Sequence, residues 1–240
     1  MPFSKTVIAE PFLDRAVTRL GPPPVTDREQ HFYSYFSEIW KDGYDNNLHN
    51  QYAAYLPFLP RSTEGVFLDI GCGAGEFVAF LNAKHIPAEG IDMDAQEVER
   101  AKRRGVIVHQ ANAREFLARA KGPFTGISLL EVIEHLPPDE IPTLLTAIFS
   151  ALVPGGVLLV ETINIKHPLA FHSFYTDPTH QRPIPSDLLV LLLQWHGFTE
   201  AKIVYTHPVA YSRSQAHDPS RAYFNYAVIA RKPTESGAEL

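Results

Sequence analysis

Short apolar runs alternate with amphipathic stretches along most of this chain of 240 residues. Five apolar runs, near residues 65–70, 88–92, 106–110, 126–130 and 156–161, have the character of buried strands. Apolar positions at helical spacing follow in 76–81, 95–104, 140–152 and 186–195. This alternation indicates right-handed crossovers and a parallel sheet. Because 201–205 and 222–231 predict a closing antiparallel pair, we expect an α/β fold with seven strands. Most should be parallel, with an antiparallel last strand and helices on both faces.

The first run leads into a glycine-rich loop, FLDIGCGAG over residues 67–75. Gly71, Gly73 and Gly75 permit a sharp turn and a close approach of the backbone to a ligand, which a Cβ atom would prevent. The dinucleotide-binding fingerprint is incomplete, because Glu76 stands where its third glycine belongs, and no Gly-Lys-Ser/Thr closes the loop as in a P-loop. The pattern therefore predicts a nucleotide-like cofactor of another kind.

The order Asp-x-Gly-x-Gly-x-Gly, beginning at Asp69, resembles motif I of the class I S-adenosylmethionine (SAM) methyltransferases. The resemblance implies a Rossmann-like fold with SAM as its cofactor. SAM has no pyrophosphate, and its ammonium and sulfonium groups tolerate Asp69 and Glu76 nearby. Cys72, within the loop, is expected to be a small packing residue rather than a nucleophile.

The next two strand ends carry matching polar residues. Asp92 lies about 20 positions beyond the loop, where an acidic residue can accept both ribose hydroxyls, and Met93 would lie against the adenine. Asn112 and Ala113 stand where the family usually has Asp-Ala, and the Asn112 side-chain oxygen can still accept a hydrogen bond from the adenine amino group. Each residue could instead be a simple cap at a strand end. The expected cofactor-binding residues are Asp69, Gly71, Cys72, Gly73, Gly75, Asp92, Met93, Asn112, Ala113 and Leu130.

Composition narrows the class of protein. The 21 basic and 27 acidic residues give a net charge of −6, which weighs against a large nucleic-acid footprint. A single cysteine excludes an internal disulfide, the first residues lack the apolar core of a signal peptide, and the apolar region 143–160 is broken by Pro154-Gly155-Gly156. That region should form a helix, a turn and a strand rather than a membrane span. We expect a cytoplasmic enzyme with an N-terminal arm and aromatic-rich helical cover over 1–59, a cofactor-binding domain over 60–232 and a disordered tail over 233–240.

The fourth strand is followed by Glu131, Glu134 and His135, at the edge of an open sheet where ligands bind. This E-x-x-E-H string resembles ubiquinone-pathway O-methyltransferases and small-RNA 3′-end ribose 2′-O-methyltransferases. The resemblance implies that Glu131, Glu134, His135 and the later His180 hold Mg²⁺, Mn²⁺ or Zn²⁺, with Glu131, His135 and His180 as catalytic residues. Without a metal, His135 or His180 could act as a general base. Alternatively, His135 is satisfied by a backbone carbonyl and Glu134 is exposed.

Residues 161–198 resemble bacterial methyltransferases associated with O-antigen and other surface-glycan synthesis. The matching features are Phe174-Tyr175, Asp177-Pro178-Thr179-His180, Pro183 and Pro185. An acceptor loop over 162–185 could use Tyr175, Asp177 and Arg182 to grip a sugar hydroxyl or a phosphate. It could also be an insertion stabilised by proline and by aspartate capping.

The first functional hypothesis is therefore a SAM-dependent O-methyltransferase for a hydroxyl or terminal phosphate of a bacterial glycan or glycan-like small molecule. The alternatives are a quinone or natural-product phenol O-methyltransferase, RNA 2′-O-methylation, and a non-catalytic SAM-binding partner protein. The acceptor and the oligomeric state stay open at this point.

Overall fold

The structure is a computed structural model that describes residues 48–60, 65–120, 122–208 and 218–234. The elements discussed below lie in a compact unit over residues 50–240. A preceding unit, Met1–His49, falls almost entirely outside the described residues. The expected N-terminal arm and most of the expected C-terminal tail also fall outside them.

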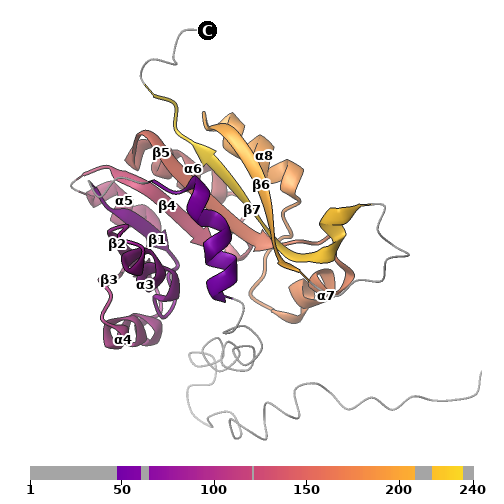
Figure 1. Ribbon diagram of the computed structural model, residues 1–240, viewed down its shortest axis with the longest axis horizontal. Coiled ribbons are helices and arrows are strands. Elements are labelled where there is room, and N and C mark those ends of the chain that lie inside the picture. Colours follow the sequence, from indigo (N-terminus) through magenta and orange to yellow (C-terminus); the bar gives the residue numbers. More distant parts are fainter. Residues whose placement is uncertain (1–47, 61–64, 121, 209–217, 235–240) are drawn as a thin grey trace, which may run out of the picture. The chain divides into compact units, whose positions relative to one another are not determined.

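One seven-stranded sheet forms the centre of this unit (Figure 1). Its strands are β1 (Phe67–Ile70), β2 (Ala88–Asp92), β3 (Val108–Gln110), β4 (Phe124–Leu130), β5 (Leu152–Ile163), β6 (Thr199–Pro208) and β7 (Tyr223–Arg231). Their order is β3-β2-β1-β4-β5-β7-β6. Strands β1 to β5 pair in parallel, whereas β7 runs antiparallel to both β5 and β6. The expected fold class is confirmed.

The strand order reverses between β1 and β4, which lie side by side. A crevice opens at such a switch point, outside the carboxyl ends of the strands. The glycine loop follows β1 and Glu131 follows β4, so both expected sites lie at this edge of the sheet.

Helices follow the strands in sequence. They are α3 (Glu76–Ala83), α4 (Ala95–Arg104), α5 (Ala113–Arg119), α6 (Glu140–Ala151), α7 (Pro168–Thr176) and α8 (Ser186–Trp195), with short 3₁₀ turns at η1 (Leu56–Phe58), η2 (Ile133–His135) and η4 (Pro219–Ala222). Buried residues of α5, α6 and α8, among them Leu117, Leu145 and Leu189, share one hydrophobic cluster with the sheet. Residues 50–55 are helical as well, and Tyr52 there packs against Phe77 of α3 with ring centroids 4.9 Å apart.

Two expectations about local structure were wrong. Residues 162–185 contain the helix α7 rather than forming one long loop. Pro154-Gly155-Gly156 do not make a turn between a helix and a strand, because β5 begins at Leu152, directly after α6. These residues belong to β5, and its pairing with β4 has a register shift between Phe124 and Gly126 that accommodates them. Gly155 takes a left-handed φ of 77°. No helix among the described residues is long and apolar enough to cross a membrane.

Candidate functional site

The glycine loop adopts a backbone that side chains would hinder. Gly71, Gly73 and Gly75 have φ values of 70°, 51° and 79°, in the left-handed region that favours glycine. A Cβ atom on Gly71 would lie 2.5 Å from Cγ2 of Val132, and one on Gly75 would lie 2.6 Å from Cγ2 of Val106. The nearest atom to a Cβ on Gly73 is 4.0 Å away, so this glycine has space beside it.

A pocket of about 530 Å³, open to solvent, lies beside this loop. Its lining includes Gly71 and four further residues expected to bind the cofactor: Asp92, Met93, Asn112 and Ala113. Val132 and Leu136, on either side of η2, form part of the same wall. The remaining expected cofactor residues, Asp69, Cys72, Gly73, Gly75 and Leu130, lie outside this lining.

Asp92 connects the pocket to the glycine loop. Its Oδ2 accepts a hydrogen bond of 2.9 Å from the Gly73 amide, and its Oδ1 accepts one of 2.8 Å from the Asp94 amide. Burial raises the pKa of Asp92, while these amide donors hold it lower. The carboxylate is therefore preorganised at the end of β2.

Asn112 is primarily a helix cap. Its Oδ1 accepts hydrogen bonds from the amides of Arg114 (3.0 Å) and Glu115 (3.4 Å), at the N-terminus of α5. Its Nδ2 lies 3.9 Å from Sδ of Met93, which is 68% exposed. The alternative that Asn112 is a cap thus accounts for the hydrogen bonds of its side-chain oxygen, although the residue also lines the pocket.

Asp69, in β1, and Cys72, within the glycine loop, are both buried. The Ser128 hydroxyl donates a 2.6 Å hydrogen bond to Oδ1 of Asp69. Burial nevertheless raises the pKa of Asp69 to about 7. Cys72 packs against Gly90, where a Cβ would lie 2.5 Å from its Sγ, and burial raises the pKa of its thiol. Cys72 is a packing residue, as the sequence predicted.

Glu131 follows β4 with a φ of 55°, which is unusual for a residue with a side chain. Asn225 of β7 donates from Nδ2 to Oε1 of Glu131 (2.5 Å) and to Oε1 of Glu161 (2.8 Å). Gln51 and Tyr55 also donate hydrogen bonds to the Glu161 carboxyl group. Burial raises the pKa of Glu161 to about 8. Asn225 therefore links the ends of β4 and β5.

Glu134 is fully buried rather than exposed, and it lies close to Glu131. No donor among the described residues reaches either of its carboxylate oxygens with hydrogen-bonding geometry, although Thr162 and His180 are near enough to favour its charged form. Burial raises the pKa of both glutamates, and the charge of Glu134 raises that of Glu131 further. Such a pair retains a proton more readily than exposed carboxylates do.

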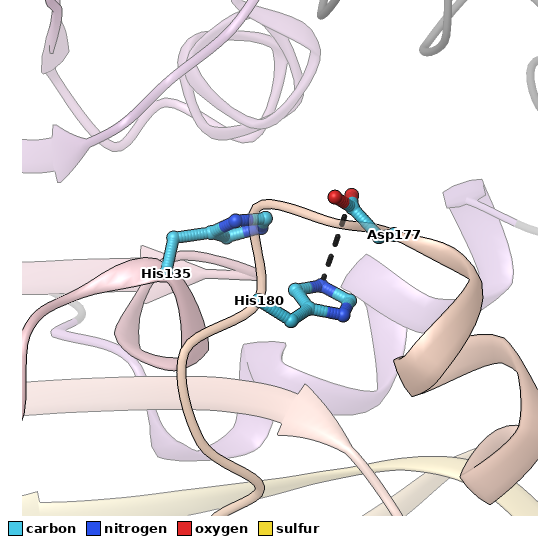
Figure 2. A group of neighbouring side chains, drawn as sticks. All are labelled: His135, Asp177 and His180. Carbon is cyan, nitrogen blue, oxygen red and sulfur yellow. Dashed lines mark ion pairs between the residues drawn. The ribbon is translucent and has the colours of Figure 1, made fainter.

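His135 and His180 lie together with Asp177, and Figure 2 shows the three side chains converging from two segments of the chain. One possible ligand atom from each residue lies within 4.8 Å of the others, and Nε2 of His180 is 3.9 Å from Oδ2 of Asp177. The two imidazole centroids are 4.5 Å apart. We call this group, His135, Asp177 and His180, the His-Asp cluster.

Hydrogen bonds hold both imidazoles of the His-Asp cluster. Thr179 Oγ1 lies 2.8 Å from Nδ1 of His135, and the Phe174 carbonyl lies 2.7 Å from Nδ1 of His180. Burial and the nearby His180 lower the pKa of His135 to about 4, although Asp177 and Thr179 act in the opposite direction. His135 is therefore a neutral imidazole near pH 7.

The structure brings some of the predicted metal-binding and acceptor-binding residues together and separates others. Two of the four predicted metal ligands, His135 and His180, belong to the His-Asp cluster, and the third member is Asp177, which was expected to contact the acceptor. Glu131 and Glu134 form the buried pair described above. Tyr175 is 66% exposed and packs edge-on against Phe171, while Arg182 is also exposed.

Sequence reasoning missed Asn225 and Glu161, and it gave no specific role to Ser128 and Thr179. Asn225, Glu161 and Ser128 are isolated polar residues within buried strands, which is a usable signal because such groups need partners. Their partners come from other strands, so the pairings themselves could not be predicted.

Comparisons with known proteins agree with this geometry. Residues 44–216 match the family model described as a methyltransferase domain. A ubiquinone biosynthesis O-methyltransferase of Brucella ovis is 37% identical over 117 residues, covering 45% of each chain, and one of Aromatoleum aromaticum is 34% identical over 104 residues, covering 40% of this chain and 43% of the relative. The matched region thus spans less than half the length of these curated relatives. Among solved structures, a SAM-dependent methyltransferase from Archaeoglobus fulgidus has the same fold, with a TM-score of 0.68, 23% identity and coverage of 77% of this chain and 93% of that one.

The family match covers well over half of the chain and includes the glycine loop, the pocket and the His-Asp cluster. The chain therefore belongs to the methyltransferase-domain family.

Proposed function

We propose that this enzyme transfers the methyl group of SAM to the hydroxyl of a phenol or catechol of the quinone type. The observation that carries the proposal is the position of the His-Asp cluster beside the cofactor pocket. Val132 and Leu136 line that pocket, and His135 lies between them in sequence on η2. A methyl donor in the pocket and a hydroxyl at the cluster would approach each other across a single turn of chain.

The expected cofactor residues support a specific orientation of SAM. Asp92, whose carboxylate is held at the pocket, would accept the ribose hydroxyls, and the exposed Met93 would contact the adenine. Asp69 lies at the base of the glycine loop, where its carboxyl group would face the ammonium end of the cofactor. Methyl transfer is an in-line displacement, so positioning of the two reactants supplies much of the rate.

The donor set also fits a divalent cation. Two imidazoles and a carboxylate lie within 4.8 Å of one another, and both oxygens of the nearby buried Glu134 lack a hydrogen-bond donor among the described residues. His135, Asp177 and His180 would hold Mg²⁺, Mn²⁺ or Zn²⁺, with Glu131 and Glu134 beside them. When bound, the cation would lower the pKa of the acceptor hydroxyl. Hydrogen bonds to Thr179 and to the Phe174 carbonyl orient the two imidazoles, and burial lowers the pKa of His135 so that it stays neutral.

The loop geometry favours an aromatic acceptor over a sugar. The Thr179 hydroxyl donates to Asp177, the same hydroxyl oxygen lies in hydrogen-bonding contact with Nδ1 of His135, and Nδ1 of His180 donates to the Phe174 carbonyl, so these polar groups are engaged within the protein. The exposed rings of Phe171 and Tyr175 on α7 offer an apolar surface instead. The curated relatives, named as ubiquinone biosynthesis O-methyltransferases, point the same way.

The test is a panel of acceptors incubated with the full chain, Mg²⁺, Mn²⁺ or Zn²⁺, and SAM labelled in its methyl group. We expect label on catechols and on quinone-type phenols, and little on sugars or nucleotide sugars. Label that appears only on sugars or sugar phosphates would contradict the proposed acceptor and support the glycan alternative.

A further inference from the structure

Arg104, the last residue of α4, joins that helix to the glycine loop. Its Nε donates a 2.9 Å hydrogen bond to the Ala74 carbonyl, and its Nη2 donates one of 2.5 Å to Oε1 of Glu76. The two acceptors lie 30 and 28 positions earlier in the sequence. Because the planar guanidinium group carries several donors in a fixed geometry, it holds the turn of the loop and the first residue of α3 at the same time.

The loop also packs against α4 at this place. A Cβ atom on Gly75 would lie 3.2 Å from Cβ of Ala101, in the last turn of α4, and 2.6 Å from Cγ2 of Val106, just beyond the helix. The loop backbone therefore lies directly against the end of α4. Arg104 adds a polar contact to this apolar one.

The residue before Ala74 connects the loop to the cofactor pocket. The Gly73 amide donates a 2.9 Å hydrogen bond to Oδ2 of Asp92, whose side chain lines that pocket. Gly73 has a φ of 51° and no atom closer than 4.0 Å to the place of a Cβ, so its own backbone offers little resistance to movement. The position of the Gly73 amide therefore depends on how the next residue, Ala74, is held.

We propose that Arg104 is a positioning residue of the cofactor site, which holds the Ala74 carbonyl and so keeps the Gly73 amide on the Asp92 carboxylate. The inference rests on the proposed function for the identity of the cofactor, SAM, whereas the contacts of the loop do not. The ion pair with Glu76 has the smaller part, because the side chains of Arg104 and Glu76 are 43% and 31% exposed and water screens such pairs.

The experiment compares Arg104→Met, which keeps an apolar stem and removes every donor, with Arg104→Lys. A lysine can keep the ion pair with Glu76 but cannot hold two acceptors in a fixed fork. Arg231→Met is the matched control, because the Arg231 guanidinium group donates to two backbone carbonyls elsewhere, those of Gly155 and Phe58.

Three quantities are measured on the full chain. Hydrogen exchange of the Gly73 amide, followed by NMR without SAM, reports whether its bond to Asp92 is kept. Titration calorimetry gives the SAM dissociation constant, and turnover at saturating SAM with the best acceptor gives kcat.

We expect Arg104→Met to exchange the Gly73 amide faster and to bind SAM about 10-fold more weakly, the effect typical of one hydrogen bond with a charged donor, with kcat unchanged. Arg104→Lys should lie between this variant and the wild type. Arg231→Met should keep the wild-type exchange rate and SAM affinity, even where its stability is lower.

Unchanged Gly73 exchange or unchanged SAM affinity in Arg104→Met would overturn the inference. Wild-type behaviour of Arg104→Lys would show that the charge alone suffices, and an equal loss of affinity in Arg231→Met would show a general loss of structure; either result would also overturn it. A wild type that does not bind SAM would contradict both this inference and the proposed function. The expected differences in SAM binding, with no acceptor methylated, would instead count against the proposed function alone.

Discussion

Asp69 is a buried carboxyl group whose protonation state makes the free energy of unfolding depend on pH. Burial raises its pKa from 3.8 to about 7, because the Ser128 hydrogen bond does not compensate for the loss of water. Between these two pH values the unfolded chain releases the proton, while the folded chain keeps it. The contribution of Asp69 to the free energy of unfolding therefore falls as the pH rises from about 4 to about 7.

We predict that Asp69→Asn removes this pH-dependent contribution to the free energy of unfolding. The difference in unfolding free energy between wild type and Asp69→Asn should change by at most about 1.4 kcal/mol per pH unit in this window, with the wild type losing stability as the pH rises. Urea denaturation of the SAM-free protein at pH 5, 6 and 7 measures it. A difference that stays constant over this range would contradict the assigned pKa.

Asn225 is a second residue whose substitution should change both the free energy of unfolding and kcat. Asn225→Leu removes the donor shared by Glu131 and Glu161, so we expect a loss of about 1–3 kcal/mol in the free energy of unfolding. Because Glu131 lies close to the buried Glu134, whose carboxyl group interacts with His180 of the His-Asp cluster, kcat should also fall while SAM affinity is kept. The control is Asn82→Leu. Asn82, near the end of α3, exchanges hydrogen bonds with the backbone of Ala88 at the start of β2, so its loss should lower stability without lowering kcat in the folded protein. Equal kcat values for the two variants would contradict the role given to Asn225.

At the scale of elements, the glycine loop combines a backbone requirement with a packing requirement. Gly71→Ala places a Cβ atom 2.5 Å from the Val132 side chain, in the wall of the cofactor pocket, and in a left-handed conformation. Gly105→Ala, at the end of α4, has the same kind of φ (84°) but meets no atom within 4 Å. Comparing Gly71→Ala with Gly105→Ala therefore separates the packing requirement from the backbone requirement.

We predict that Gly71→Ala weakens SAM binding at least about 10-fold, which corresponds to about 1.4 kcal/mol, whereas Gly105→Ala leaves it unchanged and lowers only stability. Isothermal titration of both variants with SAM measures this. Similar SAM affinities in the two variants would show that the approach of Gly71 to Val132 is not required.

The elements that the sequence predicted well are those with strong local patterns. Apolar runs and helical spacing placed β1, β2, α4 and α8 close to their observed bounds, because these patterns depend on neighbours in sequence. Helix α7 was missed since its cap is His167, whose Nδ1 accepts the Leu169 amide at 3.2 Å, and histidine is not a typical N-cap. For α5 the signal existed, as Asn112 precedes Glu115 by three positions, which is a capping pattern.

The residues of the candidate site also fall into those with a local sequence pattern and those without one. The cofactor loop and the E-x-x-E-H string are local and could be read from the sequence. The contact of His135 with Asp177 and His180 depends on α7 and the turn after it, which bring residues more than 40 positions apart together. Long-range hydrogen bonds of this kind have no local sequence pattern.

At the scale of the whole molecule, the cofactor pocket and the His-Asp cluster are neighbouring but distinct sites on one edge of the sheet. No member of the cluster lines the pocket. We therefore predict that EDTA lowers methyl transfer, that added divalent cation restores it, and that SAM affinity does not change. Titration calorimetry with SAM, with and without EDTA, gives the binding result. Full turnover in EDTA would argue that no cation takes part.

The most direct measurement of the central claim compares kcat and the SAM dissociation constant for His135→Ala with those of the wild type. His172→Ala, an exposed histidine on α7, is the matched control. If His135 belongs to the acceptor side of the crevice, its loss should lower kcat at least about 100-fold and leave SAM binding intact, while His172→Ala changes neither. An unchanged kcat, or a loss of SAM binding that accounts for the whole effect, would contradict the claim that the His-Asp cluster forms the acceptor site.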